Sequence, residues 1–393
     1  MEKYKDALSI IAIGLRGIPD VPGGVEKHAA ELYPRLQALG ASVTVLGRSP
    51  YHPPGDGNRW RGVELRWIPT PVAEGVEALV HSFCGVIYAA VQRPDVLHIH
   101  AVGPWLFAPM AKALGLKVVV THHGEDYMRE KWHKPARALL RLGERLGMTF
   151  ADERIVISRG LLELAQRKYH RSAVVIPNGV ANLQRTECTT VVEKYGLTPG
   201  RYVIQVGRLV PEKRQLDLIT AFKAAGLPDW KLVLVGGAQG SQHYADLVRA
   251  HCGEQSSIVN TGFLGADEIQ ELLSHAGVFA LPSSHEGLPI SLLEAMRLGT
   301  PILASDIPAN RETGLDDSSY FAVGDTDTLA RQLREIAAAT PEERAAIAER
   351  LRVACLRYDW DDIAESTMQV MKRIAGRSSA QLPIHERHPI QPH

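Results

Sequence analysis

The segment Ser9–Ile13, SIIAI, leads into the glycine-bearing loop GLRGIPDVPGG at residues 14–24, which is followed by a helical pattern that reaches Gly40. The first segment is an apolar run of strand length. Apolar residues then recur on one helix face, at Val25, Ala29, Leu32, Leu36 and Leu39. A buried strand that turns through glycines into an amphipathic helix is typical of a parallel sheet covered by helices.

The same alternation continues along the chain and restarts after a turn-rich stretch near residues 177–199. Before that stretch, the further predicted strands are Ser42–Leu46, Val63–Ile68, Val96–Ile99, Lys117–Thr121 and Arg154–Ile157. After it, they are Tyr202–Val206, Lys231–Val235, Ile258–Thr261, Val278–Leu281, Pro301–Ala304 and Tyr320–Val323. The pattern predicts an α/β fold with two Rossmann-like, doubly wound domains, residues 1–180 and 181–357.

The remaining residues are predicted to be helical over 358–376 and, because they lack periodicity, disordered over 377–393. Ligands of open parallel sheets bind beyond the carboxyl ends of the strands. Two such domains that face each other would form a cleft there, so the residues just after each strand are the candidates for chemistry.

The composition is that of an ordinary soluble α/β protein, with 45% hydrophobic and 22% charged residues among 393. The net charge of zero argues against nucleic acid as a partner. Residues 1–180 nevertheless carry 23 basic and 17 acidic side chains, which makes the first half the better candidate for an anionic surface. Four widely spaced cysteines fit a reducing cytoplasm. The apolar run at 8–13 is too short for a signal peptide or a membrane span, so any membrane contact would be peripheral.

Two kinds of candidate residue follow strands of the first half. Gly23 and Gly24 open the first helix, where free N–H groups attract a phosphate, and a plain strand-to-helix turn is the alternative. The motifs His98-Ile-His100 and His122-His123 end two later strands, where imidazoles can bond a substrate or transfer a proton. A structural hydrogen bond is the alternative for each histidine. A metal site is disfavoured because no cluster of carboxylates accompanies these motifs.

The second half offers charged pairs at the same kind of position. Arg208 and Lys213 follow its first strand and could clamp a diphosphate, with a solvated surface pair as the alternative. Glu286 and Glu294 lie eight residues apart, one on a loop and one inside the following helix, where carboxylates can accept paired bonds from vicinal hydroxyls. The backbone N–H groups around Gly287 and Leu288 could face a phosphate.

Two weaker signals have competing interpretations. Asp325-Thr-Asp327 has the spacing of a metal-binding DxD motif, but Asp between a strand and a helix is also the expected N-cap, which is favoured here. Residues 129–150 form a basic amphipathic pattern with Arg137, Arg141 and Arg145 in one row. That row predicts either contact with an anionic membrane surface or a solvated helix face.

The motifs taken together can be matched to a family. They are GGVE at 23–26, HIH at 98–100, THHGED at 121–126, IPNGV at 176–180, VGRLVPEK at 206–213 and EGLPISLLEAM at 286–296. In this order, over about residues 9–315, they resemble the family 4 retaining glycosyltransferases, which have the GT-B fold of two facing domains. One departure is Lys213-Arg214, where the family usually has Lys-Gly, and this is expected to alter the loop more than the charge.

The resemblance implies a nucleotide-diphosphate sugar as donor and no metal cofactor. Arg208 and Lys213 would neutralise the diphosphate, Glu286 would hold the donor sugar, and Glu294 would hold the ribose. The backbone of Leu264 would meet the base. Further contacts implied by the resemblance come from Gly23 and Gly24 at the diphosphate or acceptor, His100 in the sugar pocket and His123 near it. The last helix would cross back to the first domain.

A partial match of Gly-Ile-Pro and GGVEKH implies members that build bacterial surface polysaccharides on polyprenyl carriers. The expected acceptor is therefore a saccharide or lipid-linked saccharide, and the expected location is the cytoplasm or the inner face of its membrane. Two alternatives stay open: a sugar-nucleotide epimerase of the same fold, and a non-catalytic subunit that binds sugar nucleotides.

Overall fold

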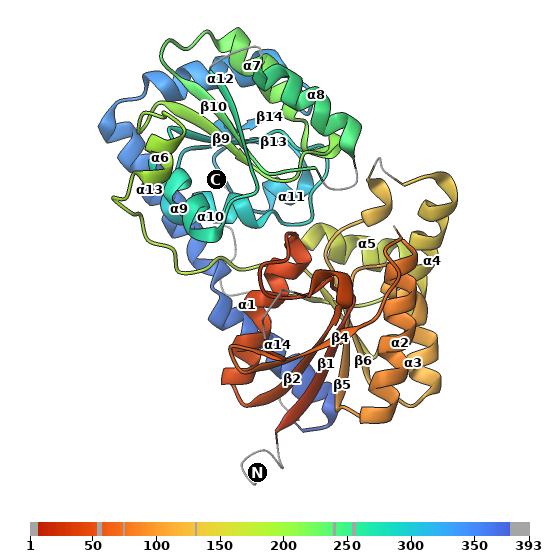
Figure 1. Ribbon diagram of the computed structural model, residues 1–393. Coiled ribbons are helices and arrows are strands. Elements are labelled where there is room, and N and C mark those ends of the chain that lie inside the picture. The colour runs from red at the N-terminus through yellow and green to blue at the C-terminus, as the bar shows by residue number, and fades with distance from the viewer. Residues whose placement is uncertain are drawn as a thin grey trace. The chain divides into compact units, whose positions relative to one another are not determined.

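Parallel sheets form the centres of both units of the chain (Figure 1). The computed structural model describes residues 7–52, 57–73, 75–129, 132–238, 241–253 and 257–377. The first unit contains residues up to 128, then 132–178, and the segment from Trp360 onward, whereas the second contains 179–359. The tail predicted to be disordered lies, from residue 378 onward, outside the described residues.

The first unit has an eight-stranded sheet in the order β3-β4-β2-β1-β5-β6-β7-β8. Its strands are β1 (Leu8–Ile13), β2 (Ala41–Arg48), β3 (Arg59–Trp60), β4 (Val63–Ile68), β5 (Val96–His100), β6 (Val118–His122), β7 (Glu153–Val156) and β8 (Val174–Val175). All neighbours are parallel except β3 and β4. Ile10 of β1 lies beside Val43 on one side and Val96 on the other. The two-residue strands β3 and β8 are too short for the sequence pattern to predict.

Helices cover both faces of this sheet. Its helices are α1 (Gly24–Ala38), α2 (Val76–Gln92), α3 (Ala108–Ala113), α4 (Lys134–Phe150), α5 (Arg159–Tyr169) and α14 (Trp360–Ala375). One core cluster packs α1 and α14 against the sheet, and a second cluster contains residues of α2, α3 and α4. Apolar side chains buried on both faces explain the near-continuous hydrophobic strands.

The last helix, α14, belongs to the first unit although it follows the whole of the second unit in the sequence. Trp360, Ile363 and Met368 are buried in the same core cluster as residues of α1. The division between the units falls at 359/360 here, two residues after the predicted one at 357/358. The buried apolar side chains of α14 therefore pack this helix against the core that contains α1, near the start of the chain.

The second unit has a six-stranded parallel sheet in the order β11-β10-β9-β12-β13-β14. Its strands are β9 (Tyr202–Val206), β10 (Lys231–Val235), β11 (Ile258–Gly262), β12 (Val278–Leu281), β13 (Ile302–Ser305) and β14 (Tyr320–Phe321). Its helices are α6 (Thr190–Lys194), α7 (Gln215–Ala225), α8 (Gln242–Gly253), α9 (Ala266–His275), α10 (Ile290–Leu298), α11 (Pro308–Arg311), α12 (Thr326–Ala338) and α13 (Pro341–Cys355). The Asp325 carboxylate accepts a hydrogen bond from the backbone N–H of Thr328 at 2.9 Å, which confirms the predicted N-cap of α12.

The strand order reverses once in the middle of each sheet. In the first unit the chain runs outward from β1 and returns to β5 on the other side of β1. In the second unit it runs outward from β9 and returns to β12. The loops after the two central strands diverge at such a reversal and leave room for a ligand at the carboxyl ends of the strands.

Glu144, on the inner face of α4, joins that helix to the sheet. Its side chain is 0% exposed and accepts hydrogen bonds from His122 Nε2 at 2.9 Å, Lys168 Nζ at 2.6 Å and the hydroxyls of Tyr127 and Tyr169. Burial alone would raise the pKa of Glu144, but these hydrogen bonds outweigh it and lower the pKa to about 2. The carboxylate is therefore ionised and fully bonded in the fold.

We predict that Glu144→Gln lowers the free energy of unfolding by about 2–3 kcal/mol at pH 7, because a neutral amide leaves the Lys168 ammonium without its charged acceptor. Urea denaturation measures this loss. Because the pKa is lower in the fold than in the unfolded chain, the contribution is complete above about pH 4.5 and disappears as the pH falls toward about 2. The gap between wild type and variant should close over that range.

Glu163→Gln is the control for this prediction. Glu163 is exposed and lies 4.0 Å from Arg167, so its loss should change the unfolding free energy by less than about 0.5 kcal/mol. An equal effect of the two substitutions would contradict the role given to Glu144.

Candidate functional site

The loop between β1 and α1 is held by an acidic side chain of the helix. The Glu26 carboxylate is buried and accepts hydrogen bonds from the Arg16 backbone N–H at 3.2 Å and from Arg16 Nε at 2.9 Å. Gly23 has φ +153°, and a Cβ there would lie 2.1 Å from the Glu26 carboxylate. This backbone conformation, which residues other than glycine rarely adopt, favours glycine at Gly23, and Gly24 follows it as the first residue of α1.

The end of β5 lies against the same loop. Gly14 has φ +93°, and a Cβ there would lie 2.1 Å from the carbonyl oxygen of His100. This close approach brings the predicted sugar-pocket histidine to the reversal between β1 and β5. The glycine-bearing loop and His100 are neighbours because of the strand order, as residues at a ligand site of such a sheet are.

A chain of hydrogen bonds runs through the buried polar groups behind this loop. His98 Nε2 lies 2.7 Å from Thr121 Oγ1, and His98 Nδ1 lies 2.9 Å from the Tyr33 hydroxyl. The Tyr33 hydroxyl also lies 2.5 Å from His100 Nε2, and His100 Nδ1 lies 2.8 Å from His123 Nε2. His98, Tyr33 and His100 are each 0% exposed, whereas His123 is half-buried.

Burial keeps these imidazoles neutral. Burial lowers the pKa of His28 to about 4 and that of His98 to about 3. It also lowers the pKa values of His100 and His123, with neighbouring histidines adding to the effect. Each ring therefore carries a single N–H, so that each bond in the chain has one donor and one acceptor.

Both ring nitrogens of His100 are engaged in this structure, one by Tyr33 and one by His123. His123 is the more accessible member of the pair. The sequence motifs pointed to His98, His100 and His123 but not to Tyr33, which lies in the middle of α1. Its position five residues after His28 on α1 carries no signal of its own, because a tyrosine at core spacing is an ordinary core residue.

The charged residues of the second unit meet at the other reversal. Lys213 follows β9 and Glu286 follows β12, and Lys213 Nζ lies 2.5 Å from Glu286 Oε1. Their side chains are 13% and 11% exposed. An ammonium and a carboxylate held together at the carboxyl ends of adjacent strands can exchange this bond for bonds to an anionic, hydroxyl-rich ligand.

Buried amides hold the loop that carries Lys213. Gln205 Nε2 donates to the Lys213 carbonyl at 2.8 Å, and Gln215 Nε2 donates to the Arg208 carbonyl at 2.9 Å. Arg208 Nη2 lies 3.8 Å from the Glu212 carboxylate. Sequence reasoning did not identify the two glutamines, since amides that bond to a loop backbone have no motif.

The remaining predicted residues of the second unit occupy neighbouring positions. Glu294 is 6% exposed on α10, the helix that follows the Glu286 loop. Gly287 and Leu288 lie on that loop, with Leu288 buried. Leu264 is half-buried in the turn between β11 and α9.

Arg214 stands at the position where the family that the motifs resemble usually has the glycine of a Lys-Gly pair. It has φ +50° and ψ +42°, the left-handed conformation that glycine adopts most readily. Its side chain donates to Asp217 at 2.5 Å. The loop therefore keeps a conformation suited to glycine although arginine occupies the position.

Comparisons with known proteins cover parts of both units. Residues 191–353 match the family described as glycosyl transferases group 1, and residues 22–181 match glycosyltransferase family 4. Alpha-maltose-1-phosphate synthase of Mycobacterium tuberculosis is 30% identical over 397 residues, which cover 91% of this chain and 97% of that relative. The chain belongs to the family 4 glycosyltransferases.

Two further similarities bear on this glycosyltransferase. GDP-mannose:cellobiosyl-diphosphopolyprenol alpha-mannosyltransferase of Komagataeibacter xylinus is 30% identical over 190 residues, 46% of this chain and 47% of that relative. The structure of sucrose-phosphate synthase from Thermosynechococcus elongatus has a TM-score of 0.78 at 20% identity, covering 94% of this chain and 100% of that one. The protein thus has the GT-B fold predicted from its sequence.

Proposed function

We propose that this enzyme transfers a sugar, with retention of anomeric configuration, from a nucleotide-diphosphate sugar to a hydroxyl of a polyprenyl-linked saccharide. The observation that carries the proposal is the Lys213–Glu286 pair at the reversal of the second sheet. A diphosphate needs cations and a sugar needs hydroxyl acceptors, and this pair presents one of each.

Donor binding in this scheme uses residues of the second unit. Lys213 and Arg208 turn to the diphosphate, and Glu286 accepts hydrogen bonds from hydroxyls of the donor sugar. Glu294 holds the ribose hydroxyls, while the backbone at Gly287 and Leu288 faces phosphate oxygens. No divalent cation is needed at the diphosphate, because the two basic side chains supply its positive charge.

The transfer step breaks the bond between the sugar C1 and the diphosphate oxygen and forms a bond from C1 to the acceptor oxygen on the same face. The acceptor proton passes to the departing diphosphate. Negative charge grows on the diphosphate as the bond breaks, so Lys213 and Arg208 stabilise the transition state more than the bound donor.

The acceptor class rests on two observations. The Komagataeibacter relative carries diphosphopolyprenol in its name, and the GIPDVPGGVEKH loop of this chain resembles that of enzymes acting on polyprenyl carriers. A lipid-linked acceptor also requires the enzyme to work at a membrane surface.

Substitution of Lys213 should mainly affect turnover, and substitution of Glu294 should mainly affect nucleotide binding. We predict that Lys213→Ala lowers kcat by roughly 10²–10³, because the lost charge acts mainly on the leaving diphosphate. Glu294→Gln should instead weaken nucleoside diphosphate binding by roughly tenfold to a hundredfold, since ribose contacts form in the ground state. Transfer of labelled sugar from a donor panel measures the first effect and calorimetry the second.

Two substitutions at exposed positions are the matched controls: Lys223→Ala on α7 and Glu335→Gln on α12. Each should leave kcat and the affinity for nucleoside diphosphate unchanged. Chelation with EDTA should not change the affinity for nucleoside diphosphate. Binding that requires Mg²⁺ or Mn²⁺ would refute the metal-free clamp, and label that remains on an epimerised donor would refute transfer.

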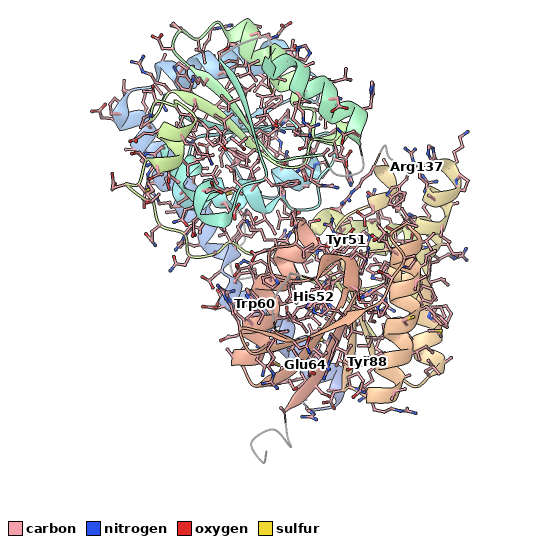
Figure 2. The ribbon with its side chains drawn as sticks, viewed as in Figure 1. Tyr51, His52, Trp60, Glu64, Tyr88 and Arg137 are labelled. Atoms are coloured by element: carbon pink, nitrogen blue, oxygen red, sulfur yellow. The ribbon has the colours of Figure 1, made fainter. Side chains whose placement is uncertain are left out.

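The outer face of the first unit supports the membrane part of the proposal. On α4, Arg141 and Arg145 are exposed, whereas Arg137, near the start of the helix (Figure 2), is half-buried. Exposed apolar side chains accompany them on α4 (Leu139, Leu142, Phe150) and on α2 (Val76, Phe83, Ile87, Val91). A helix that exposes both basic and apolar side chains suits the interface of an anionic bilayer. Among the described residues, no helix is long and apolar enough to cross a membrane.

We predict that the double variant Arg141→Glu, Arg145→Glu binds anionic vesicles roughly 30-fold more weakly than wild type, at about 1 kcal/mol for each basic residue near the surface. Vesicle sedimentation at low and high salt measures the effect, which salt should diminish. Arg249→Glu, Arg331→Glu reverses two exposed charges of the second unit and is the control. Equal weakening by both pairs would show that net charge, and not the α4 face, governs binding.

A further inference from the structure

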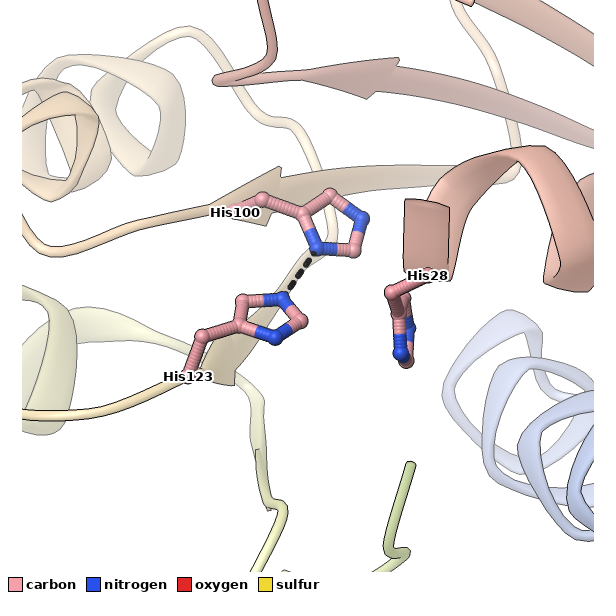
Figure 3. A group of neighbouring side chains, drawn as sticks. All are labelled: His28, His100 and His123. Carbon is pink, nitrogen blue, oxygen red and sulfur yellow. Dashed lines mark hydrogen bonds between the residues drawn. The ribbon is translucent and has the colours of Figure 1, made fainter. Parts of the chain in front are cut away.

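Three histidines from separate segments gather in the first unit (Figure 3). His28 comes from the start of α1, His100 from the end of β5 and His123 from the loop after β6. One ring nitrogen of each lies within 4.8 Å of those of the other two. The sequence disfavoured a metal at the histidine motifs because no cluster of carboxylates accompanies them, and His28 is a third imidazole that only the fold brings to them.

His28 presents a lone pair with no partner. Its Nδ1 lies 2.9 Å from the side-chain oxygen of Asn178. An amide oxygen can only accept, so Nδ1 carries the hydrogen and Nε2 of the neutral ring is a bare acceptor. His28 is 3% exposed, and among the described residues its Nε2 has no hydrogen-bond partner. The lone pair on Nε2 is therefore available to a ligand.

The other two histidines face the same space. Their facing nitrogens, His100 Nδ1 and His123 Nε2, lie 2.8 Å apart. The ring of His28 is 4.8 Å from that of His123 and 5.6 Å from that of His100, centre to centre. The far nitrogen of His100 is bonded to the Tyr33 hydroxyl, as that of His28 is to Asn178. Metal-bound histidines characteristically carry such a bond on their second nitrogen.

We propose that His28 Nε2, His100 Nδ1 and His123 Nε2 bind a divalent transition-metal ion of the Zn²⁺ class, with a fourth position open to an oxygen ligand. Three histidines and one open position form a known tetrahedral zinc donor set. Nitrogens at about 2.0–2.1 Å from zinc lie roughly 3.3 Å from one another. The His100–His123 pair would open slightly, and His28 would move toward it.

Binding leaves each imidazole neutral. His28 keeps its hydrogen on Nδ1 toward Asn178, and His100 carries its hydrogen on Nε2 toward Tyr33. The hydrogen shared between His100 and His123 moves to the outer nitrogen of its ring, so no proton is released. His123 is half-buried and gives the ion a route of entry. The site shares no residue with the Lys213–Glu286 pair and does not rest on the proposed function.

The test uses the full chain, stripped with a chelator, incubated with Zn²⁺ and passed through a desalting column. Wild type should retain about one equivalent of zinc by mass spectrometry, and His28→Ala at least about tenfold less. His133→Ala is the control, because His133 is an exposed histidine of the same unit and should not affect retention. Loading wild type with Co²⁺ should give the intense visible absorption of tetrahedral coordination.

The proposal is overturned if the reloaded wild type retains no zinc, or if His28→Ala retains as much zinc as wild type. Should His28→Ala fail to fold, the Co²⁺ spectrum of wild type decides. Weak absorption typical of octahedral coordination would refute a three-histidine site.

Discussion

The reversal of strand order in each sheet is the constraint on which the candidate sites depend. Parallel strands end at the same edge, and the loops on either side of a reversal diverge from one another. In the first unit this places the glycine-bearing loop beside the end of β5, and in the second it places Lys213 beside Glu286. Residues 73 positions apart in sequence therefore meet at one ion pair.

The side chains at the two reversals of strand order differ in charge. The second unit gathers charged side chains, Lys213 and Arg208 with Glu286 and Glu212, as the recognition of a charged, hydroxyl-rich donor requires. The first unit gathers imidazoles that burial holds neutral. Its excess of basic residues lies partly on the exposed face of α4. A positive exterior and a neutral histidine cluster can thus serve separate purposes, surface binding and ligand coordination.

Much of the fold could be predicted because parallel strands are buried on both faces and appear as apolar runs. Val63–Ile68, Tyr202–Val206 and Val278–Leu281 occur with the predicted bounds. The Asp325 cap was equally predictable, since a cap is a local interaction. The part played by Glu144 was not, because its partners His122, Lys168 and Tyr169 converge only after α4 and α5 have packed on the sheet. His28 and Tyr33 were missed for the same reason: their partners, Asn178 and His98, come from distant segments.

The central claim is that the loops after β9 and β12, at the reversal of strand order in the second sheet, bind the nucleotide diphosphate of the donor. Hydrogen exchange of the full chain, with and without saturating UDP or GDP, tests it most directly, because bound ligand slows exchange of the amides that it covers. The account predicts that the largest slowing falls in residues 206–214 and 283–294, the loops after β9 and β12. Slowing confined to the first unit, or slowing of the second unit that spares both loops, would contradict it.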